Sequence, residues 1–128
     1  KRSNMLKELI IVCSICFAIS SISVGDATTT NQYDKKGNYT GYYKSLGGIT
    51  NYYDNTGKYT GYARSSIGRM DYYDKKGRHT GYSYSKLDNT ITNFYDSDGK
   101  YTGYSKYDSG VTKYYNQKGK YKSYDSER

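Results

Sequence analysis

Hydrophobic and polar residues follow two different patterns along this chain of 128 residues. An apolar run at 9–19 comes first, and the remainder is polar, with aromatic residues at regular intervals. A ten-residue pattern, Tyr-Asp-x-x-Gly-Lys-Tyr-Thr-Gly-Tyr, occurs five times, the last copy being degraded; the copies begin at Tyr33, Tyr53, Tyr73, Tyr95 and Tyr115. A period of about 20 residues predicts one supersecondary unit repeated along the chain.

Each copy predicts a β-hairpin, as the second one illustrates. Residues 49–53 are β-branched and aromatic, which suits a strand. The segment 54–57 has Asp at the first and Gly at the fourth position of a type I turn, and 58–62 supplies the return strand. This turn predicts that Tyr53 pairs with Tyr59.

The same register divides the side chains of this hairpin between two faces, because successive residues of a strand alternate in direction. It pairs Tyr52 with Thr60 and Thr50 with Tyr62. One face then carries Ile49, Tyr53 and Tyr59, with Gly61 leaving space, and the other carries Thr50, Tyr52, Thr60 and Tyr62. We expect the first face to form the interior and the second to meet solvent or a ligand.

The fold class that follows is all-β: five stacked hairpins, forming either a solenoid-like array or a meandering antiparallel sheet, after an N-terminal hydrophobic signal helix. Isolated hairpins are marginal in water, so each repeat must lean on its neighbours. One domain is expected over 28–128, with repeats near 29–48, 49–68, 69–90, 91–110 and 111–128. The degraded last repeat is expected to be a cap.

The start of the chain has the layout of a secretory signal peptide over 1–27, with a short upstream extension. Charged residues precede the apolar run, and small residues follow it. The run is shorter than the roughly 20 residues of a membrane span, which favours a cleaved signal peptide. The alternative is an uncleaved membrane anchor. Both cysteines, Cys13 and Cys16, lie in this run, so no disulfide can staple the repeats. The expected location is secreted, periplasmic or at the cell surface.

Composition indicates that tyrosine must form the core. The chain has 20 tyrosines and no tryptophan, and its repeats contain few aliphatic residues. A buried tyrosine contributes a large ring and a hydroxyl that seeks a partner. Low hydrophobicity with a net charge of +8 also fits disorder. The regular turn chemistry favours a folded array.

The sequence has few residues of the types that act in catalysis, and we expect no enzyme, no metal site and no cofactor. The one histidine, His79, occupies a slot that holds tyrosine in the other copies, which favours a packing role. The segment 96–99 faintly resembles a calcium loop, but no downstream glutamate completes it, so turn chemistry explains it better.

Turn and strand chemistry explain most recurring residues of the repeat, but not the tyrosine after Thr-Gly or the basic residue after the turn glycine. These two features are therefore the candidates for binding. The candidate ligand-binding residues are Tyr42, Tyr62, Tyr82, Tyr104, Lys58, Arg78 and Lys100. Basic groups beside aromatic rings suit an acidic glycan or another anionic cell-wall polymer. The alternative is that the lysines keep an exported β-stack soluble. Nucleic acid is the least favoured partner, and the membrane would be contacted only through an uncleaved signal segment.

The repeat resembles two bacterial families of β-hairpin repeats over 29–124. Tyr-Asp-x-x-Gly-Lys/Arg is similar to the YD repeat of Rhs-type secreted and surface proteins. Gly-x-x-x-Tyr-Tyr followed by Gly and Thr-Gly-Tyr is more loosely similar to the cell-wall-binding repeats of choline-binding proteins and clostridial toxins. The latter resemblance implies aromatic cages for choline or sugar, although a tryptophan usually follows Thr-Gly in that family.

The sequence therefore predicts a secreted or cell-surface, non-catalytic repeat protein that binds envelope or host polysaccharide through tyrosine-lined grooves. One alternative is a self-assembling fibre or envelope scaffold protein, joined by open strand edges. Another is a small secreted effector that binds a host protein.

Overall fold

A computed structural model describes residues 27–86 and 88–127, and this part of the chain is all-β. The predicted signal segment lies outside the described residues, apart from Ala27. No helix in the described part is long and apolar enough to cross a membrane. The strands are β1 (Thr28–Asp34), β2 (Tyr39–Leu46), β3 (Ile49–Asp54), β4 (Tyr59–Ser66), β5 (Arg69–Asp74), β6 (His79–Ser85), β7 (Ile91–Asp96), β8 (Tyr101–Asp108), β9 (Val111–Asn116) and β10 (Tyr121–Glu127).

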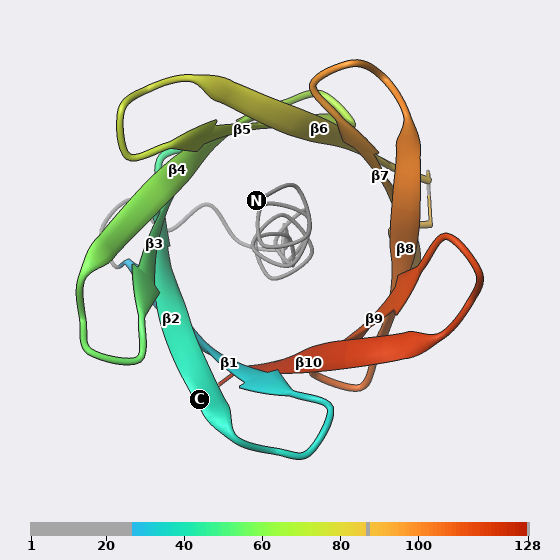
Figure 1. Cartoon of the computed structure of the whole chain (residues 1–128), viewed down its shortest axis with the longest axis horizontal. Helices are drawn as coiled ribbons and strands as arrows, with labels where there is room; N and C mark the ends of the chain where they lie inside the picture. The colour runs from blue at the N-terminus through green and yellow to red at the C-terminus, as the bar shows by residue number, and fades with distance from the viewer. Residues whose placement is uncertain (1–26, 87, 128) are drawn as a thin grey trace.

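The strands form one antiparallel meander that closes into a barrel (Figure 1). Each strand pairs with the next in sequence, and β1 pairs with β10 in the register Tyr33 to Tyr124. The all-β hairpin prediction is thus confirmed, with the meandering sheet as its arrangement. We had expected the fifth repeat to cap an open array, but its strand β10 pairs with β1 instead. Strand tilt and stagger accumulate around the sheet and bring β10 beside β1, so neither strand has an open edge.

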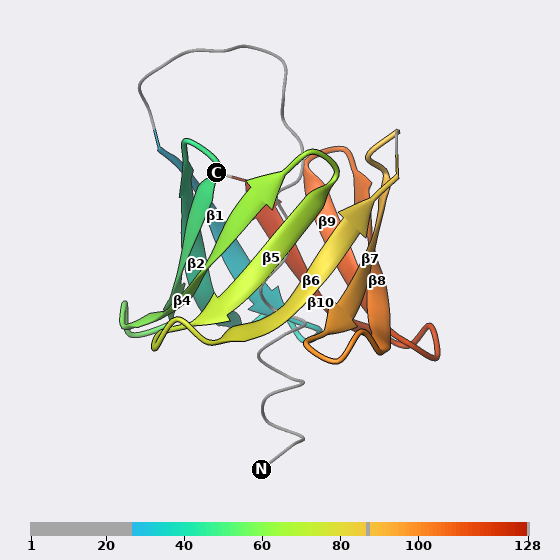
Figure 2. The same ribbon diagram turned by 90° about the horizontal axis from the view of Figure 1, so that it is seen from above.

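The Asp-x-x-Gly segments form the predicted turns. In the second repeat, the Gly57 N–H donates to the Asp54 carbonyl oxygen (3.0 Å), and Gly57 has φ of 81°. All five such turns lie at one end of the barrel, where they splay outward (Figures 1 and 2). We call this the turn end, comprising residues 34–38, 54–58, 74–78, 96–100 and 116–120. The connections between repeats form the opposite, short-turn end.

The strand register departs from the prediction one residue after the turn. Tyr53 pairs with Tyr59 as expected, but a bulge then leaves Thr60 out of the ladder. Tyr52 therefore lies opposite Gly61, and Thr50 lies opposite Ala63. Equivalent register shifts occur in the other four hairpins. The next strand passes close to the residue after the bulge, which requires glycine there, since a Cβ on Gly61 would lie 2.3 Å from the Tyr73 carbonyl oxygen.

The predicted assignment of the two faces to interior and exterior was wrong for β3 and for Tyr59. Thr50 and Tyr52, expected outside, are buried in the interior. Tyr53 and Tyr59, expected inside, lie on the outer face together with Tyr62. One extra residue in a strand turns every later side chain to the other face. The alternation along β3 was predicted correctly, but the Tyr53 face was taken for the interior. The bulge changes only the residues after it, so that Gly61 lies opposite the buried Tyr52 while Tyr62 shares the outer face with Tyr53 and Tyr59.

The interior is a tyrosine core, as the composition indicates. Its buried hydrophobic residues are Tyr43, Tyr52, Ala63, Met70, Tyr72, Phe94 and Tyr114. The inner aromatic has a glycine opposite it within the hairpin in repeats two to four, and Ser123 takes that place in the fifth. In repeats three to five it also has a small residue on the preceding strand, as Tyr72 has Ala63. The Tyr72 hydroxyl is hydrogen-bonded to Ser83 Oγ at 2.8 Å. Small partners thus provide the space that the large rings fill.

Candidate functional site

The outer face carries five groups of three aromatic rings, which we call the outer ladders. Each ladder crosses three adjacent strands near the turn end. The ladders are Tyr42–Tyr53–Tyr59, Tyr62–Tyr73–His79, Tyr82–Tyr95–Tyr101, Tyr104–Tyr115–Tyr121 and Tyr124–Tyr33–Tyr39.

The geometry of the five ladders is nearly identical. The first two rings are stacked, with centroids 4.8–5.1 Å apart and interplanar angles of 11–13°. The third ring meets the second edge-on, at 5.5–6.0 Å and 62–68°. Both arrangements are favourable for the ring quadrupole and add to the burial of the rings.

Each stacked pair joins two repeats. The first ring follows Thr-Gly in one repeat, and the second precedes the first turn residue of the next, which is aspartate in four turns and Asn116 in the fifth. The ladder at the seam between β10 and β1 obeys the same rule, with Tyr124 on Tyr33 at 5.0 Å. Tyr124 therefore has a structural role, although the Thr-Gly before it has become Lys122-Ser123.

The rings of a ladder differ in what they offer to a ligand. The stacked rings are half-buried, and each has one face covered by the other ring. The third ring is more open in three of the tyrosine ladders, with exposed fractions of 40% for Tyr39, 37% for Tyr59 and 36% for Tyr101, whereas Tyr121 is half-buried. Partial burial raises the pKa of the Tyr59 and Tyr101 hydroxyls, and neighbouring tyrosines raise it further, so both remain neutral hydrogen-bond donors near pH 7.

A basic side chain lies over the first ring in three ladders. Lys44 Nζ is 5.8 Å from the Tyr42 centroid, the Arg64 guanidinium is 5.5 Å from Tyr62, and Lys106 Nζ is 5.9 Å from Tyr104. These are cation–π distances. The sequence analysis missed these cations, although the spacing Gly-Tyr-x-Lys/Arg could have revealed them, because residues two apart on a strand share a face.

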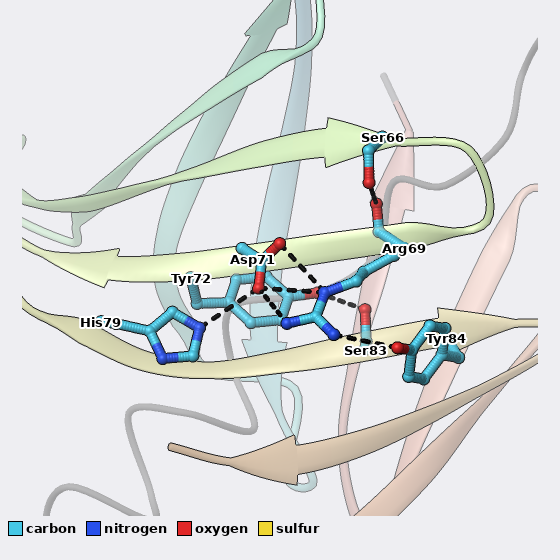
Figure 3. Close-up of polar contacts among 7 residues, drawn as sticks. All are labelled: Ser66, Arg69, Asp71, Tyr72, His79, Ser83 and Tyr84. Atoms are coloured by element: carbon cyan, nitrogen blue, oxygen red, sulfur yellow. Dashed lines mark hydrogen bonds and ion pairs between the residues drawn. The ribbon is translucent and has the colours of Figure 1, made fainter. Parts of the chain in front are cut away.

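The third repeat replaces this arrangement with a polar cluster (Figure 3). Arg69 lies 4.3 Å from the Tyr82 ring centroid, and its Nη2 pairs with Asp71 Oδ1 at 2.6 Å. Its Nη1 donates to the Tyr84 hydroxyl (2.9 Å), and His79 Nε2 lies 3.2 Å from the same Asp71 oxygen. The hydrogen bonds that Arg69 donates to the Asp71 carboxylate lower the pKa of Asp71 and raise the pKa of Arg69. The cation of this ladder is therefore neutralised by its carboxylate.

The structure separates the predicted binding residues into two groups. The four tyrosines after Thr-Gly are each the first ring of a different ladder, so they are spread around the barrel. The three predicted basic residues, Lys58, Arg78 and Lys100, are exposed at successive turns of the turn end. Arg78 Nε is paired with Asp74 Oδ2 at 2.7 Å.

The segment 96–99 is held by turn chemistry. Asp96 Oδ1 accepts the backbone N–H groups of Asp98 and Lys100, both at 2.9 Å. The same two bonds recur in the other turns, including the fifth, where the Asn116 side chain accepts them. Within 27–86 and 88–127, no group of three histidine, cysteine or acidic side chains is placed to hold a metal ion.

Comparison with known proteins shows no family for this chain. No family model matches it, and no curated protein matches it. Among solved structures, the chain is similar to one in the crystal structure of a GtfA/B complex bound to UDP and GlcNAc, at 13% identity and a TM-score of 0.27. The similarity covers 94% of this chain and 30% of that chain.

Proposed function

We propose that this chain is a secreted or cell-surface, non-catalytic repeat protein whose outer ladders bind envelope or host polysaccharide. The observation that supports the proposal most is the fivefold repetition of the outer ladders on a closed barrel. In this proposal, residues 1–27 form a hydrophobic signal segment that directs export, and 28–128 form the binding domain.

The chemistry of the ladders suits sugars. A sugar ring has an apolar C–H face and a rim of hydroxyl groups, and tyrosine offers an apolar ring with a polar end. Because each ladder is internally packed, its rings are already fixed and lose little conformational entropy on binding. The more open third rings, Tyr39, Tyr59 and Tyr101, provide the contact face, and the hydroxyls provide hydrogen bonds.

Several equivalent sites on one small barrel also suit a polymer. A polysaccharide repeats the same unit along its length, so one chain can engage two or more ladders. Each further contact then forms at a high effective concentration and strengthens the overall binding.

Self-assembly through open strands has less support than binding. That alternative needs an unpaired edge strand, whereas β1 and β10 pair with each other in the barrel. The effector alternative requires a protein-binding surface, and the outer ladders are spread around the barrel, an arrangement that favours a repeating polymer over a single protein partner.

Affinity electrophoresis in gels containing neutral or acidic polysaccharides tests this proposal. The test variant carries Tyr39→Ser, Tyr59→Ser and Tyr101→Ser, and the matched control carries Tyr107→Ser, since Tyr107 is equally exposed at 43% but lies outside the ladders. We expect the triple variant to lose about tenfold in affinity for the retained polysaccharide, and the control to change less than about twofold. Equal migration of the triple variant and the wild type in every gel would contradict the proposal.

A further inference from the structure

The turn end of the barrel concentrates positive charge. Its five turns contain nine basic and five acidic side chains, a local net charge of +4. The basic residues are Lys35, Lys36, Lys58, Lys75, Lys76, Arg78, Lys100, Lys118 and Lys120, and all nine are exposed. Because the turns splay outward around the barrel mouth (Figures 1 and 2), these charges form a ring.

The acidic residues of the turns do not cancel this ring. In the first turn, Asp34 Oδ1 accepts the backbone N–H groups of Lys36 (2.8 Å) and Asn38 (2.9 Å). The equivalent aspartates of the next three turns do the same, so these carboxylates are directed into their own loops. Of the nine basic side chains, Arg78 is the one with a carboxylate partner among the described residues. The eight lysines are left to interact with solvent or a ligand.

The short-turn end has a different surface. Its connections are brief and rich in glycine, and they expose aliphatic side chains such as Leu46 (58%) and Ile67 (105%). Lys86 is the one basic residue in the 86–90 connection, where Asp88 also lies. The loops of the two ends therefore differ in charge: the turn end has a net charge of +4, whereas the connections at 47–48, 67–68, 86–90 and 109–110 together carry one basic and one acidic residue.

We propose that the turn end is a docking surface for an acidic polysaccharide, a sugar polymer that carries repeated sulfate or carboxylate groups. Ammonium groups on flexible stems at five positions can each meet an anionic group of such a polymer. This deepens the proposed function by naming the class of polysaccharide, and it rests on that function for the choice of a sugar polymer.

The turn end adjoins the outer ladders. Gly99 belongs to the fourth turn, and a Cβ added to it would lie 3.4 Å from the Tyr82 hydroxyl. In the same way, a Cβ added to Gly37 would lie 3.7 Å from the Tyr124 hydroxyl, and one added to Gly119 would lie 3.9 Å from the Tyr104 hydroxyl. Tyrosine hydroxyls and lysines therefore occur together, so one sugar unit can meet both a hydrogen-bonding group and a cation.

Two other polyanions fit this end less well. An anionic lipid surface is usually held by cations together with apolar side chains that enter it, and the turn tips carry none. Single-stranded nucleic acid binds by stacking bases on open aromatic faces, whereas the first two rings of each ladder stack on each other.

The test measures the affinity of the full chain for dextran sulfate, with uncharged dextran as the neutral polymer. The variant Lys58→Gln/Lys100→Gln removes two charges from the turn end, and Lys86→Gln/Lys113→Gln removes two exposed charges elsewhere. Glutamine keeps the backbone N–H groups that hold the turns. We expect about tenfold weaker binding to dextran sulfate for the turn-end pair and less than about twofold for the control pair. The dependence of affinity on salt concentration should also be shallower for the turn-end pair.

Three outcomes would overturn this inference. If the turn-end pair and the control pair lose affinity for dextran sulfate equally, the polymer is attracted by the net charge of the protein and not by the turn end. Tighter binding to a single-stranded oligonucleotide, or to vesicles of anionic lipid, than to dextran sulfate would assign the surface to another partner. These outcomes differ from a failure of the proposed function. That function fails if the Tyr39→Ser/Tyr59→Ser/Tyr101→Ser variant binds dextran sulfate and uncharged dextran as tightly as the wild type does.

Discussion

Tyr72 and Tyr73 are neighbours in the chain and lie on opposite faces of the sheet. Tyr72 is 1% exposed in the interior, where its hydroxyl is bonded to Ser83. Burial raises the pKa of this hydroxyl far above its usual value, so it stays neutral. Tyr73 is half-buried on the outer face, stacked on Tyr62 and met edge-on by His79.

The difference shows how one residue type builds both the core and the surface of this barrel. The inner tyrosines replace the aliphatic residues that the chain lacks, and small residues opposite them provide the space. The outer tyrosines do not fill a core; they join repeats by stacking and leave hydroxyls and one open ring for contact. The Tyr-Tyr pair of a repeat therefore combines a folding residue with a surface residue.

Alanine substitution at the two neighbours should separate these roles most clearly. Tyr72→Ala removes a fully buried ring, and we expect it to lower the free energy of unfolding by about 3–5 kcal/mol. Tyr73→Ala removes a half-exposed ring and two ring contacts, and we expect about 1–2 kcal/mol. Chemical denaturation followed by circular dichroism measures both. Equal losses at the two sites would mean that the outer ladders form part of the core.

The glycines distinguish the inner sheet from the turns in the same way. Gly61→Ala places a Cβ 2.3 Å from the Tyr73 carbonyl oxygen, with φ of 157°. Because the neighbouring strand must move, we expect a loss of about 2–4 kcal/mol. Gly57→Ala is the matched control: its φ is 81° and nothing lies within 4 Å of the added Cβ, so the cost is backbone strain of about 1–2 kcal/mol. Thermal unfolding of the two variants checks this order.

Much of this fold follows from local sequence. The period, the Asp-x-x-Gly turn and the aromatic strands are sufficient to predict five antiparallel hairpins and a tyrosine core. These features act over a few residues, where turn geometry and strand propensity decide the structure. The signal segment and the binding function stay predictions.

The errors arise where contacts between strands decide the structure. The bulge at Thr60 is followed by Gly61, which the β5 backbone approaches closely, and no local pattern within the hairpin shows that approach. Closure by β1 and β10 depends on the tilt of the whole sheet. The cations of the outer ladders could have been found once the faces were assigned, since Lys44 follows Tyr42 by two residues. Arg69, Asp71 and His79 meet only through two paired strands.

The smallest expected effect concerns the turn carboxylates, which lie outside the tyrosine core. Side-chain hydrogen bonds from Asn38 and Thr56, with backbone N–H groups, lower the pKa of Asp34 and Asp54. Burial raises the pKa of Asp74, but the hydrogen bonds from Arg78 outweigh it and the net pKa is lowered. A lowered pKa in the folded state gives stability that is present above the unfolded pKa and is lost as pH falls through the folded value. We therefore expect the barrel to lose stability as pH falls from about 5.

The variant Asp34→Asn/Asp54→Asn/Asp74→Asn should flatten this acid dependence without removing the turns. Asn116 shows why, because its amide oxygen accepts the backbone N–H groups of Lys118 (3.0 Å) and Lys120 (2.9 Å) in the fifth turn. Melting temperatures of the variant and the wild type should converge as pH falls from 6 towards about 3, while the wild type remains the more stable at pH 7. If the two profiles stay parallel over this range, the acid sensitivity comes from other carboxylates, such as Asp71 with its lowered pKa, and the turn carboxylates do not contribute to it.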